Sequence, residues 1–397
     1  MTPYSVYVHI PFCRHRCAYC DFNTYTGLDN LIPDYVCALV REIEILASST
    51  GVHLPVHTIF FGGGTPSLLP PSELERILST LGTRFNLQPE LEVTLEANPG
   101  TIDLAYLYDI RGMGVNRLSL GMQSANPEEL HLLERQHDFP DVVRAVEWAR
   151  QAGFSNLNLD LIFGLPDQPI ESWSRTLSLA LGLHTDHLSL YALTLEHGTP
   201  MQHWVSRGLL PDPDPDLAAD MYELASDRLG EASFSQYEIS NWARKYDQDN
   251  LMVCHHNLHY WRNQPYLGIG AGAHGYAAGV RTSNVLSPVV YTHQLLDNDD
   301  QRIETFPRTP ATVQTQPIYR LAEIGETMMM GLRLTQEGVS NQSFQDRFKE
   351  TLQEVFGPQI ERLVGLGLLE WAGIGGDILR LTRRGRLLGN QVFIEFL

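Results

Sequence analysis

Residues 7–20 read YVHIPFCRHRCAYC and place Cys13, Cys17 and Cys20 directly after a run that has the composition of a β-strand. Thiolates at this C-x3-C-x2-C spacing are typical ligands of an iron–sulfur cluster, and a cubic [4Fe–4S] cluster normally takes four of them. Three cysteines therefore leave one iron of such a cluster without a protein ligand. An open iron of this kind can bind a small molecule.

Three cysteines at this spacing have two other known uses, a zinc site and a haem attachment site. A structural zinc site normally has four protein ligands, so it would need His9, His15 or Asp21 in addition to the cysteines. A c-type haem attachment site is excluded, because Asp21 stands where that motif requires histidine. The chain has five cysteines, an odd number, which argues against a disulfide framework and favours a reducing compartment such as the cytoplasm.

The first half of the chain alternates short strand-like runs with amphipathic helical stretches, which is typical of a parallel sheet. The expected strands are residues 4–10, 57–61, 91–96, 117–121, 157–163 and 187–192. Six such units predict an α/β fold with a partial (β/α)6 barrel, since a complete barrel needs eight. Helices are expected over residues 33–47 and 72–81, the second with a capping box formed by Ser72 and Glu75.

The expected domains are a barrel over residues 1–205, a barrel-capping region over 206–296, a linker over 297–317 and a small α+β domain over 318–397. In the last domain, helices over 318–332 and 344–366 precede a β-ribbon formed by 367–371 and 378–382. This order predicts a winged-helix-like domain.

Polar residues and glycines follow several of the predicted strands. Residues 61–66 read FGGGTP after the second strand, and Glu96, Gln123 and Asp160 lie at the ends of later strands. Any one of these side chains could be a cap or a hydrogen-bonded polar group of the core. Together they indicate a functional site, because active sites of such barrels lie at the C-terminal ends of the strands.

The cysteine motif resembles that of the radical S-adenosylmethionine (SAM) superfamily, and within it the oxygen-independent coproporphyrinogen III oxidase family. The resemblance implies a [4Fe–4S] cluster held by the three cysteines and SAM bound at the open iron. In this resemblance Glu96 suits the sulfonium or ribose end of SAM, and Arg135 suits its carboxylate. The residues at SAM-contacting positions would be Tyr7, Gly63, Gly64, Thr65, Glu96, Gln123, Arg135, Asp160 and Ala192.

Two features separate this chain from the oxidases of that family. The oxidases carry a fourth cysteine two residues after the third, where this chain has Phe22. The oxidases also carry an N-terminal extension before the first strand, whereas the first strand of this chain is expected to begin at about Tyr4. Residues 254–261, CHHNLHYW, resemble the H-N-x-x-Y-W motif of the family's haem chaperone branch. That resemblance implies a haem site at four residues: His256, Asn257, Tyr260 and Trp261.

In this interpretation His256 offers an imidazole to the haem iron, while Tyr260 and Trp261 offer flat apolar faces to the porphyrin. Asn257 would orient the imidazole or bind a propionate. The identity of the ligating histidine stays open, because the motif has three other histidines as neighbours: His255, His259 and His274.

The leading hypothesis is a radical SAM-type haem chaperone that receives haem and delivers it to apo-haem proteins, with SAM cleavage left open. The alternative is an oxygen-independent coproporphyrinogen III oxidase. A third hypothesis, a DNA-binding regulator, would use Arg383, Arg384 and Arg386, but 28 basic against 47 acidic residues give a net charge of −19, which disfavours a nucleic-acid partner. We expect no membrane span, a cytoplasmic location, a homodimer, and membrane recruitment only through partner proteins.

Overall fold

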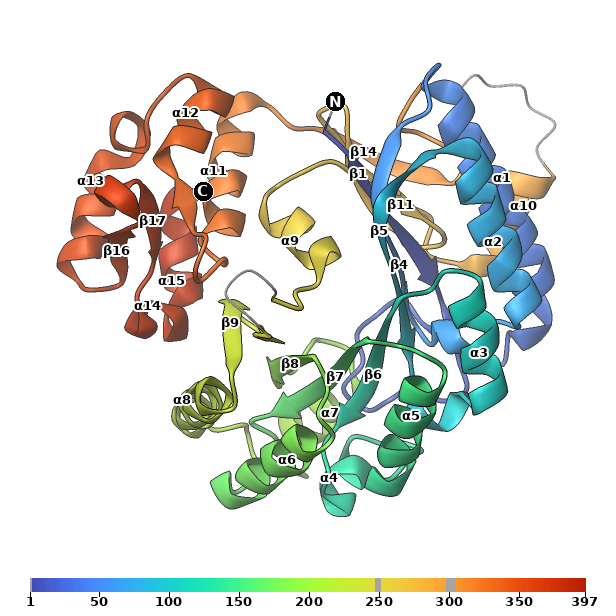
Figure 1. Ribbon diagram of the computed structural model, residues 1–397, viewed down its shortest axis with the longest axis horizontal. Coiled ribbons are helices and arrows are strands. Elements are labelled where there is room, and N and C mark those ends of the chain that lie inside the picture. Colours follow the sequence, from blue (N-terminus) through green and yellow to red (C-terminus); the bar gives the residue numbers. More distant parts are fainter. Residues whose placement is uncertain (1, 247–250, 298–304) are drawn as a thin grey trace. The chain divides into compact units, whose positions relative to one another are not determined.

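The computed structural model describes residues 2–246, 251–297 and 305–397, which form two compact units (Figure 1). The first unit comprises Met1–Arg228 with Pro265–Gln316, and the second comprises Leu229–Gln264 with Pro317–Leu397. The residues expected to cap the barrel, 206–296, therefore contribute to both units. Residues 298–304 of the expected linker lie outside the described residues.

The first unit is built on a run of parallel strands that pair in chain order. All six strands expected from the sequence are confirmed, and so is the α/β class. These strands are β1 (Tyr4–Ile10), β4 (Pro55–Gly63), β5 (Asn86–Ala97), β6 (Arg117–Gln123), β7 (Asn156–Phe163) and β8 (His187–Ala192).

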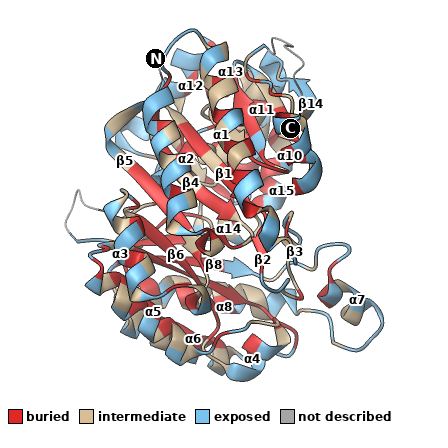
Figure 2. Ribbon diagram, turned by 90° about the vertical axis from the view of Figure 1, so that its right-hand side faces the viewer, coloured by how far each residue is buried: buried red, intermediate tan, exposed pale blue. Residues whose placement is uncertain are grey.

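Helices connect successive strands and lie along the outer side of the strand arc (Figure 1). Each turns one apolar stripe toward the sheet, as α1 does with Val36, Leu39 and Ile43, all fully buried. Figure 2 shows buried strands and helices whose solvent sides are exposed. The connecting helices are α1 (Ile32–Ser49), α2 (Pro71–Arg84), α3 (Leu104–Gly112), α4 (Pro127–Leu132), α5 (Phe139–Gln151) and α6 (Ile170–Gly182), followed by α7 (Pro200–Ser206) and α8 (Pro215–Glu231).

A second group of strands extends the sheet beyond β1. Strand β11 (Tyr266–Ile269) pairs parallel with β1, and β12 (His274–Ala277) and β13 (Val280–Asn284) continue antiparallel. The next strand, β14 (Thr312–Pro317), falls in the expected linker, so that part of the linker is a sheet edge. Helix α10 (Pro288–Leu296) packs on α1.

A buried carboxylate on α1 ties this extension to the barrel. Glu42 accepts hydrogen bonds from the backbone N–H of Gly270 (2.8 Å), the amide of Asn284 (2.8 Å) and the hydroxyls of Tyr291 (2.5 Å) and Thr309 (2.9 Å). Burial raises the pKa of Glu42, and these four donors oppose the rise. A buried carboxylate is tolerated when its lone pairs are satisfied in this way.

The second unit contains a β-hairpin, a short helix and a winged-helix-like array. The hairpin joins β9 (Phe234–Glu238) and β10 (Asn241–Arg244), and helix α9 (His255–Trp261) follows it. The array has the order helix, strand, two helices and hairpin. Its elements are α11 (Arg320–Gly331), β15 (Val339–Ser340), α12 (Asn341–Phe348), α13 (Leu352–Gly365), β16 (Leu369–Ala372) and β17 (Ile378–Leu381), with α14 (Arg383–Leu387) and α15 (Gly389–Phe393) at the end.

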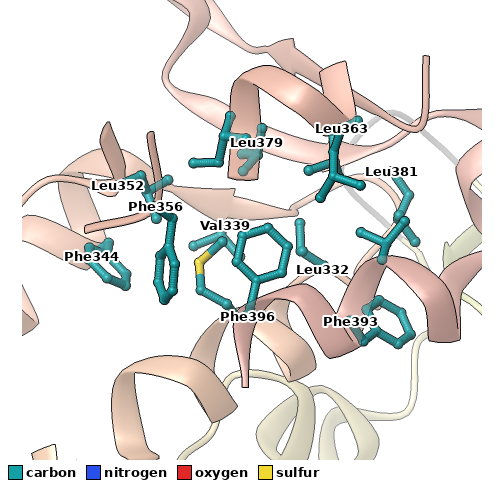
Figure 3. Packing of buried hydrophobic residues seen from close by; sticks show 14 of the residues in the cluster. Leu332, Val339, Phe344, Leu352, Phe356, Leu363, Leu379, Leu381, Phe393 and Phe396 are labelled. Carbon is teal, nitrogen blue, oxygen red and sulfur yellow. The ribbon is translucent and has the colours of Figure 1, made fainter. Parts of the chain in front are cut away.

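The three-stranded sheet β15-β17-β16 and the helices of this array enclose one apolar core (Figure 3). Leu379 on β17 is fully buried in this core, to which α12, α13 and α15 contribute leucine or phenylalanine side chains. Arg384 and Arg386 of α14 bond within this unit, to the carbonyl of Leu366 (3.4 Å) and the side chain of Gln236 (2.8 Å). These two cations are therefore partly used in the fold, which weakens the DNA-binding hypothesis.

Two local expectations are wrong. Helix α2 begins at Pro71 after the N-cap residue Pro70, and Ser72 and Glu75 form no capping box, because Ser72 already lies inside the first turn. The continuous helix expected over 344–366 is divided into α12 and α13 at Lys349, whose φ of 61° ends α12 in the left-handed region.

In the part of the chain that the structure describes, no helix combines the length and apolar character needed to cross a bilayer.

The packing of the core in Figure 3 can be tested by measuring the stability of two variants. Leu379→Ala should lower the free energy of unfolding by about 2–5 kcal/mol, since Leu379 is fully buried and truncation leaves a cavity. Ile374→Ala on the same hairpin should change it by no more than about 0.5 kcal/mol, because Ile374 is 100% exposed. Denaturant unfolding of the two variants measures both values, and equal effects would contradict this packing.

Candidate functional site

The cysteine loop follows β1 and begins in the short pair β2 (Phe12–Cys13) and β3 (Tyr25–Thr26). Cys13 is buried, Cys17 and Cys20 are half-buried, and all three thiols are free. Burial raises the pKa of the Cys13 thiol, and the neighbouring Cys20 and Cys17 raise it further. The structure thus brings the predicted ligands into one loop.

Among the described residues, no three His, Cys, Asp or Glu side chains meet closely enough to hold one metal ion. A cubic cluster does not require this arrangement, because each cysteine binds a different iron. Two of the extra ligands considered for zinc are engaged elsewhere. His9 accepts from the Tyr7 hydroxyl at Nδ1 (2.9 Å) and donates from Nε2 to the carbonyl of Asn23 (2.9 Å), and His15 pairs with Glu134 (3.3 Å).

The glycine turn after β4 lies directly against the first cysteine. The backbone N–H groups of Gly64 and Thr65 bond to carbonyls of Ile10 and Phe12 (both 2.8 Å). A Cβ at Gly64 would lie 2.6 Å from the Phe12 carbonyl oxygen and 3.0 Å from Cys13 Sγ. The turn therefore needs glycine here, because any side chain would collide with the cysteine loop.

Arg135 reaches the same loop from the segment after α4. Its guanidinium donates to Cys17 Sγ (3.5 Å), to the Gly121 carbonyl (3.0 Å) and to the side-chain oxygen of Asn98. Asn98 in turn donates to the hydroxyl of Thr65 (3.1 Å). Arg135 Nε is buried and has no hydrogen-bond partner among the described residues, which leaves one donor for a carboxylate of a bound molecule.

Polar and apolar residues alternate along the barrel strands, as in Arg117-Leu-Ser-Leu on β6 and Asn156-Leu-Asn-Leu-Asp on β7. Strands of a fully covered parallel sheet are usually apolar on both faces. Because the period is two, the leucines lie on the helix side and the polar residues share the other face. The inner face is therefore a hydrogen-bonding surface.

On this face, Asp160 is held by several donors. Ser119 donates to Asp160 Oδ2 (2.9 Å), and the amide of Asn158 donates to Asp160 Oδ1 (2.9 Å) and to the Ser119 hydroxyl (2.7 Å). Asn158 Oδ1 accepts from His187 Nδ1 (2.7 Å) and from the Ser189 hydroxyl (3.2 Å). Burial raises the pKa of Asp160, but the donors Ser119, Asn158 and Ser189 and the Arg117 cation all oppose this.

Glu96 lies on β5, which is separated from the strand of Asp160 by β6, and its environment is less favourable for a charge. Burial, together with the charge of Asp160, raises the pKa of Glu96 to about 8, while the backbone N–H of Gly63 and the Arg117 cation act against the shift. With more donors, Asp160 is the better-stabilised carboxylate of the two. Glu96 is thus the group that carries a proton near neutral pH.

The remaining predicted residues lie at the same edge of the sheet. Tyr7 stacks on Phe60 (ring centroids 6.3 Å apart), and a Cβ on Gly62 would lie 3.0 Å from the Tyr7 ring and 3.2 Å from Glu96 Oε2. Gln123 ends β6 with a left-handed φ of 62°. Ala192 lies exposed at the end of β8. Five polar residues near this site were not predicted from the sequence: Asn98, Arg117, Ser119, Asn158 and His187. The position directly after β5 marked Asn98, and the period-two pattern marked the other four.

The second predicted site lies on α9 in the second unit. His256 is only 1% exposed, and its Nε2 lies 3.0 Å from the Tyr260 hydroxyl one helical turn later. The two rings meet edge to face at 4.9 Å. Asn257 and Trp261 are half-buried, and Trp261 lies beneath the guanidinium of Arg333 (5.0 Å to the ring centroid).

Comparisons with known proteins identify the families and the fold that this chain shares. The radical SAM superfamily matches residues 7–180, and the HemN C-terminal domain family matches residues 320–388. The structure of coproporphyrinogen III oxidase (HemN) from Escherichia coli covers 99% of this chain and 90% of its own, with a TM-score of 0.82 and 24% identity, which shows a shared fold. The fold and the cysteine loop therefore define a radical SAM protein.

Two relatives show to which family within the radical SAM superfamily this chain belongs. The haem chaperone HemW of Bacillus subtilis is 36% identical over 99% of both chains. The mitochondrial radical S-adenosyl methionine domain-containing protein 1 of Mus musculus is 39% identical over 93% of this chain and 82% of its own. The chain belongs to the family of the haem chaperone HemW, as the cysteine and H-N-x-x-Y-W motifs predicted.

The environment of Glu96 predicts a pH-dependent stability. A carboxyl with a folded pKa of about 8 and an ordinary value of 4.5 stabilises the folded state fully below pH 4.5 and loses that effect as pH rises through 8. Between pH 5 and 9, the wild type without cluster or SAM should therefore lose on the order of 4 kcal/mol relative to Glu96→Gln. Urea unfolding across this range measures the difference.

Glu90, exposed on the same strand, provides the control, and Glu90→Gln should follow the wild type at every pH. Parallel pH curves for wild type and Glu96→Gln would show that Glu96 is ionised throughout.

Proposed function

We propose that this chain is a radical SAM-type haem chaperone, which binds a [4Fe–4S] cluster, SAM and haem and delivers haem to apo-haem proteins. The observation that carries the proposal is the H-N-x-x-Y-W helix α9, where a buried His256 and Tyr260 stand one turn apart beside Trp261. A helix of this composition offers an imidazole and aromatic faces, which are what a haem carrier needs.

The cluster and SAM would be held in the first unit. Cys13, Cys17 and Cys20 would bind three irons, and the orphan donor of Arg135 and the bare backbone of Gly63 and Gly64 fit the amino and carboxylate end of SAM. When bound, a reduced cluster supplies the electron that can cleave the sulfonium of SAM. The chain's own part is to bind and orient SAM at the cysteine loop.

The two carboxylates would divide the recognition of the rest of SAM. Asp160 is oriented by Ser119 and Asn158, so it is ready to accept hydrogen bonds from ribose hydroxyls. Glu96 holds a proton near neutral pH, and a cationic ligand beside it would favour release of that proton. Four further residues complete the proposed contacts with SAM: Tyr7, Thr65, Gln123 and Ala192.

In the haem site, His256 would ligate the iron and Asn257 would orient the imidazole or bind a propionate. Ligation through Nε2 requires His256 to give up its hydrogen bond with Tyr260. Binding is therefore coupled to a local rearrangement of α9, which suits a protein that must also release haem.

Phe22 bears on the choice between chaperone and oxidase. It occupies the position of the oxidases' fourth cysteine and is 63% exposed, with an aromatic ring in place of a thiol. A radical SAM-type haem chaperone with Phe22 at this position would therefore not oxidise coproporphyrinogen III.

We further propose a cytoplasmic location, a homodimer and recruitment to a membrane by partner proteins. Size-exclusion chromatography tests the homodimer, and fractionation of cells tests the location and the recruitment.

Substitution of the three cysteines tests whether they bind the cluster. Replacing Cys13, Cys17 or Cys20 by alanine should abolish the visible absorbance of anaerobically reconstituted protein, because each thiolate would hold a different iron. Cys37→Ala is the matched control, since Cys37 lies on α1 and contacts Arg76 (3.2 Å). Full iron content in all three cysteine variants, or stoichiometric zinc in the wild type, would contradict the assignment.

Haem binding can be tested separately from cluster binding. Wild type should shift the Soret band of added haem, His256→Ala should weaken the binding, and the triple alanine variant at Cys13, Cys17 and Cys20 should retain it, because the two sites use different residues. Reconstituted protein with SAM and an electron donor should leave coproporphyrinogen III unchanged. Many turnovers to protoporphyrinogen would make the chain an oxidase.

A further inference from the structure

Arg333, just after α11, lies between two aromatic rings of the second unit. Its guanidinium is 5.0 Å from the ring centroid of Trp261, the last residue of α9, and 4.9 Å from that of Phe393 on α15. Stacking on aromatic faces stabilises a cation but satisfies none of the five N–H donors of arginine.

The position of Arg333 beside α9 is fixed by its neighbours. Arg262, the residue after Trp261, forms a two-pronged ion pair with Glu337 (2.9 and 2.7 Å). The amide of Asn263 donates to the hydroxyl of Thr327 on α11 (3.0 Å). These bonds hold the end of α9 against α11 and the segment that follows it.

Arg333 differs from other arginines of this unit. Across the described residues its guanidinium has no hydrogen bond and no ion pair, whereas five neighbours in the unit each pair with a glutamate: Arg262, Arg320, Arg347, Arg362 and Arg380. The carboxylate that acts on Arg333 is Glu238, which lies beyond ion-pair distance and accepts from the Ser240 N–H (3.0 Å) and the Asn241 amide.

A second donor in the same stack also lacks an acceptor. Trp261 Nε1 is buried and has no hydrogen-bond partner among the residues that the structure describes. A half-buried cation and a buried N–H without acceptors are both costly unless a ligand supplies oxygen atoms. A carboxylate has two oxygens and the charge that this place lacks.

We propose that Arg333, stacked on Trp261, is a binding site for a carboxylate of the ligand of α9, and specifically for a haem propionate. This inference rests on the proposed function, because haem is the ligand that α9 is proposed to bind. Haem carries two propionates, and a chain with a net charge of −19 repels them unless a local cation is available. Arg333 is such a cation, next to the aromatic residue that ends the motif.

The test compares haem with haem dimethyl ester, which keeps the iron and ring but lacks both carboxylates. Soret titrations of the full-length chain in one detergent buffer give both affinities. We expect Arg333→Gln to bind haem roughly ten- to a hundredfold more weakly than wild type, the loss of a charge-assisted hydrogen bond, and to bind the ester equally well. The ratio of the two affinities within one variant is independent of any loss of folded protein.

Arg380→Gln is the matched control, because it removes an equivalent charge of the same unit whose partner is Glu370 and which lies on β17, outside the contacts of α9. It should leave the ratio of haem to ester affinity unchanged, and Arg333→Lys should restore part of the preference for haem. An unchanged ratio in Arg333→Gln would overturn the inference and leave the haem site in place. A wild type that binds neither ligand would overturn the proposed function itself.

Discussion

The two chemically different faces of each parallel strand are the constraint on which the first unit depends. In β6 and β7 every second residue is a large apolar residue, mostly leucine, that packs toward the helices, so the residues between them must face inward. These inner residues are Arg117, Ser119, Asn158 and Asp160. One period-two pattern thus builds the core on one side and orients the carboxylates on the other.

Close backbone approach adds the second element of the site. Parallel pairing of β1 with β4 brings the glycine turn alongside the cysteine loop, and Gly64 fits there because a side chain would collide with Phe12 and Cys13. Arg135 then connects the loop to Asn98 and Thr65. Residues from four separate segments are held by direct contacts, so a ligand would meet an arrangement that is already formed.

The second unit is stabilised by an apolar core and by ion pairs on its surface. Its core is apolar, five of its arginines pair with glutamates, and Arg262 and Asn263 hold the C-terminal end of α9. Within this well-satisfied framework, His256 and Tyr260 bond to each other and Arg333 stacks on Trp261. Polar groups that find partners inside the fold stabilise it, and those that do not are where a ligand can bind.

The sequence by itself determined the six strands, the cysteine loop, the glycine turn after β4 and the H-N-x-x-Y-W motif. Residue spacing and the period of the apolar pattern are local properties that can be read without knowing the fold. Prediction from the sequence failed where a single backbone turn decides the outcome, at Lys349 and at Pro71. Only the tertiary structure decided that Asn158 and Ser119 orient Asp160, that Asn98 meets Arg135, and that Arg333 reaches Trp261. These contacts join residues up to 72 positions apart, and such pairs become neighbours only when strands and helices pack.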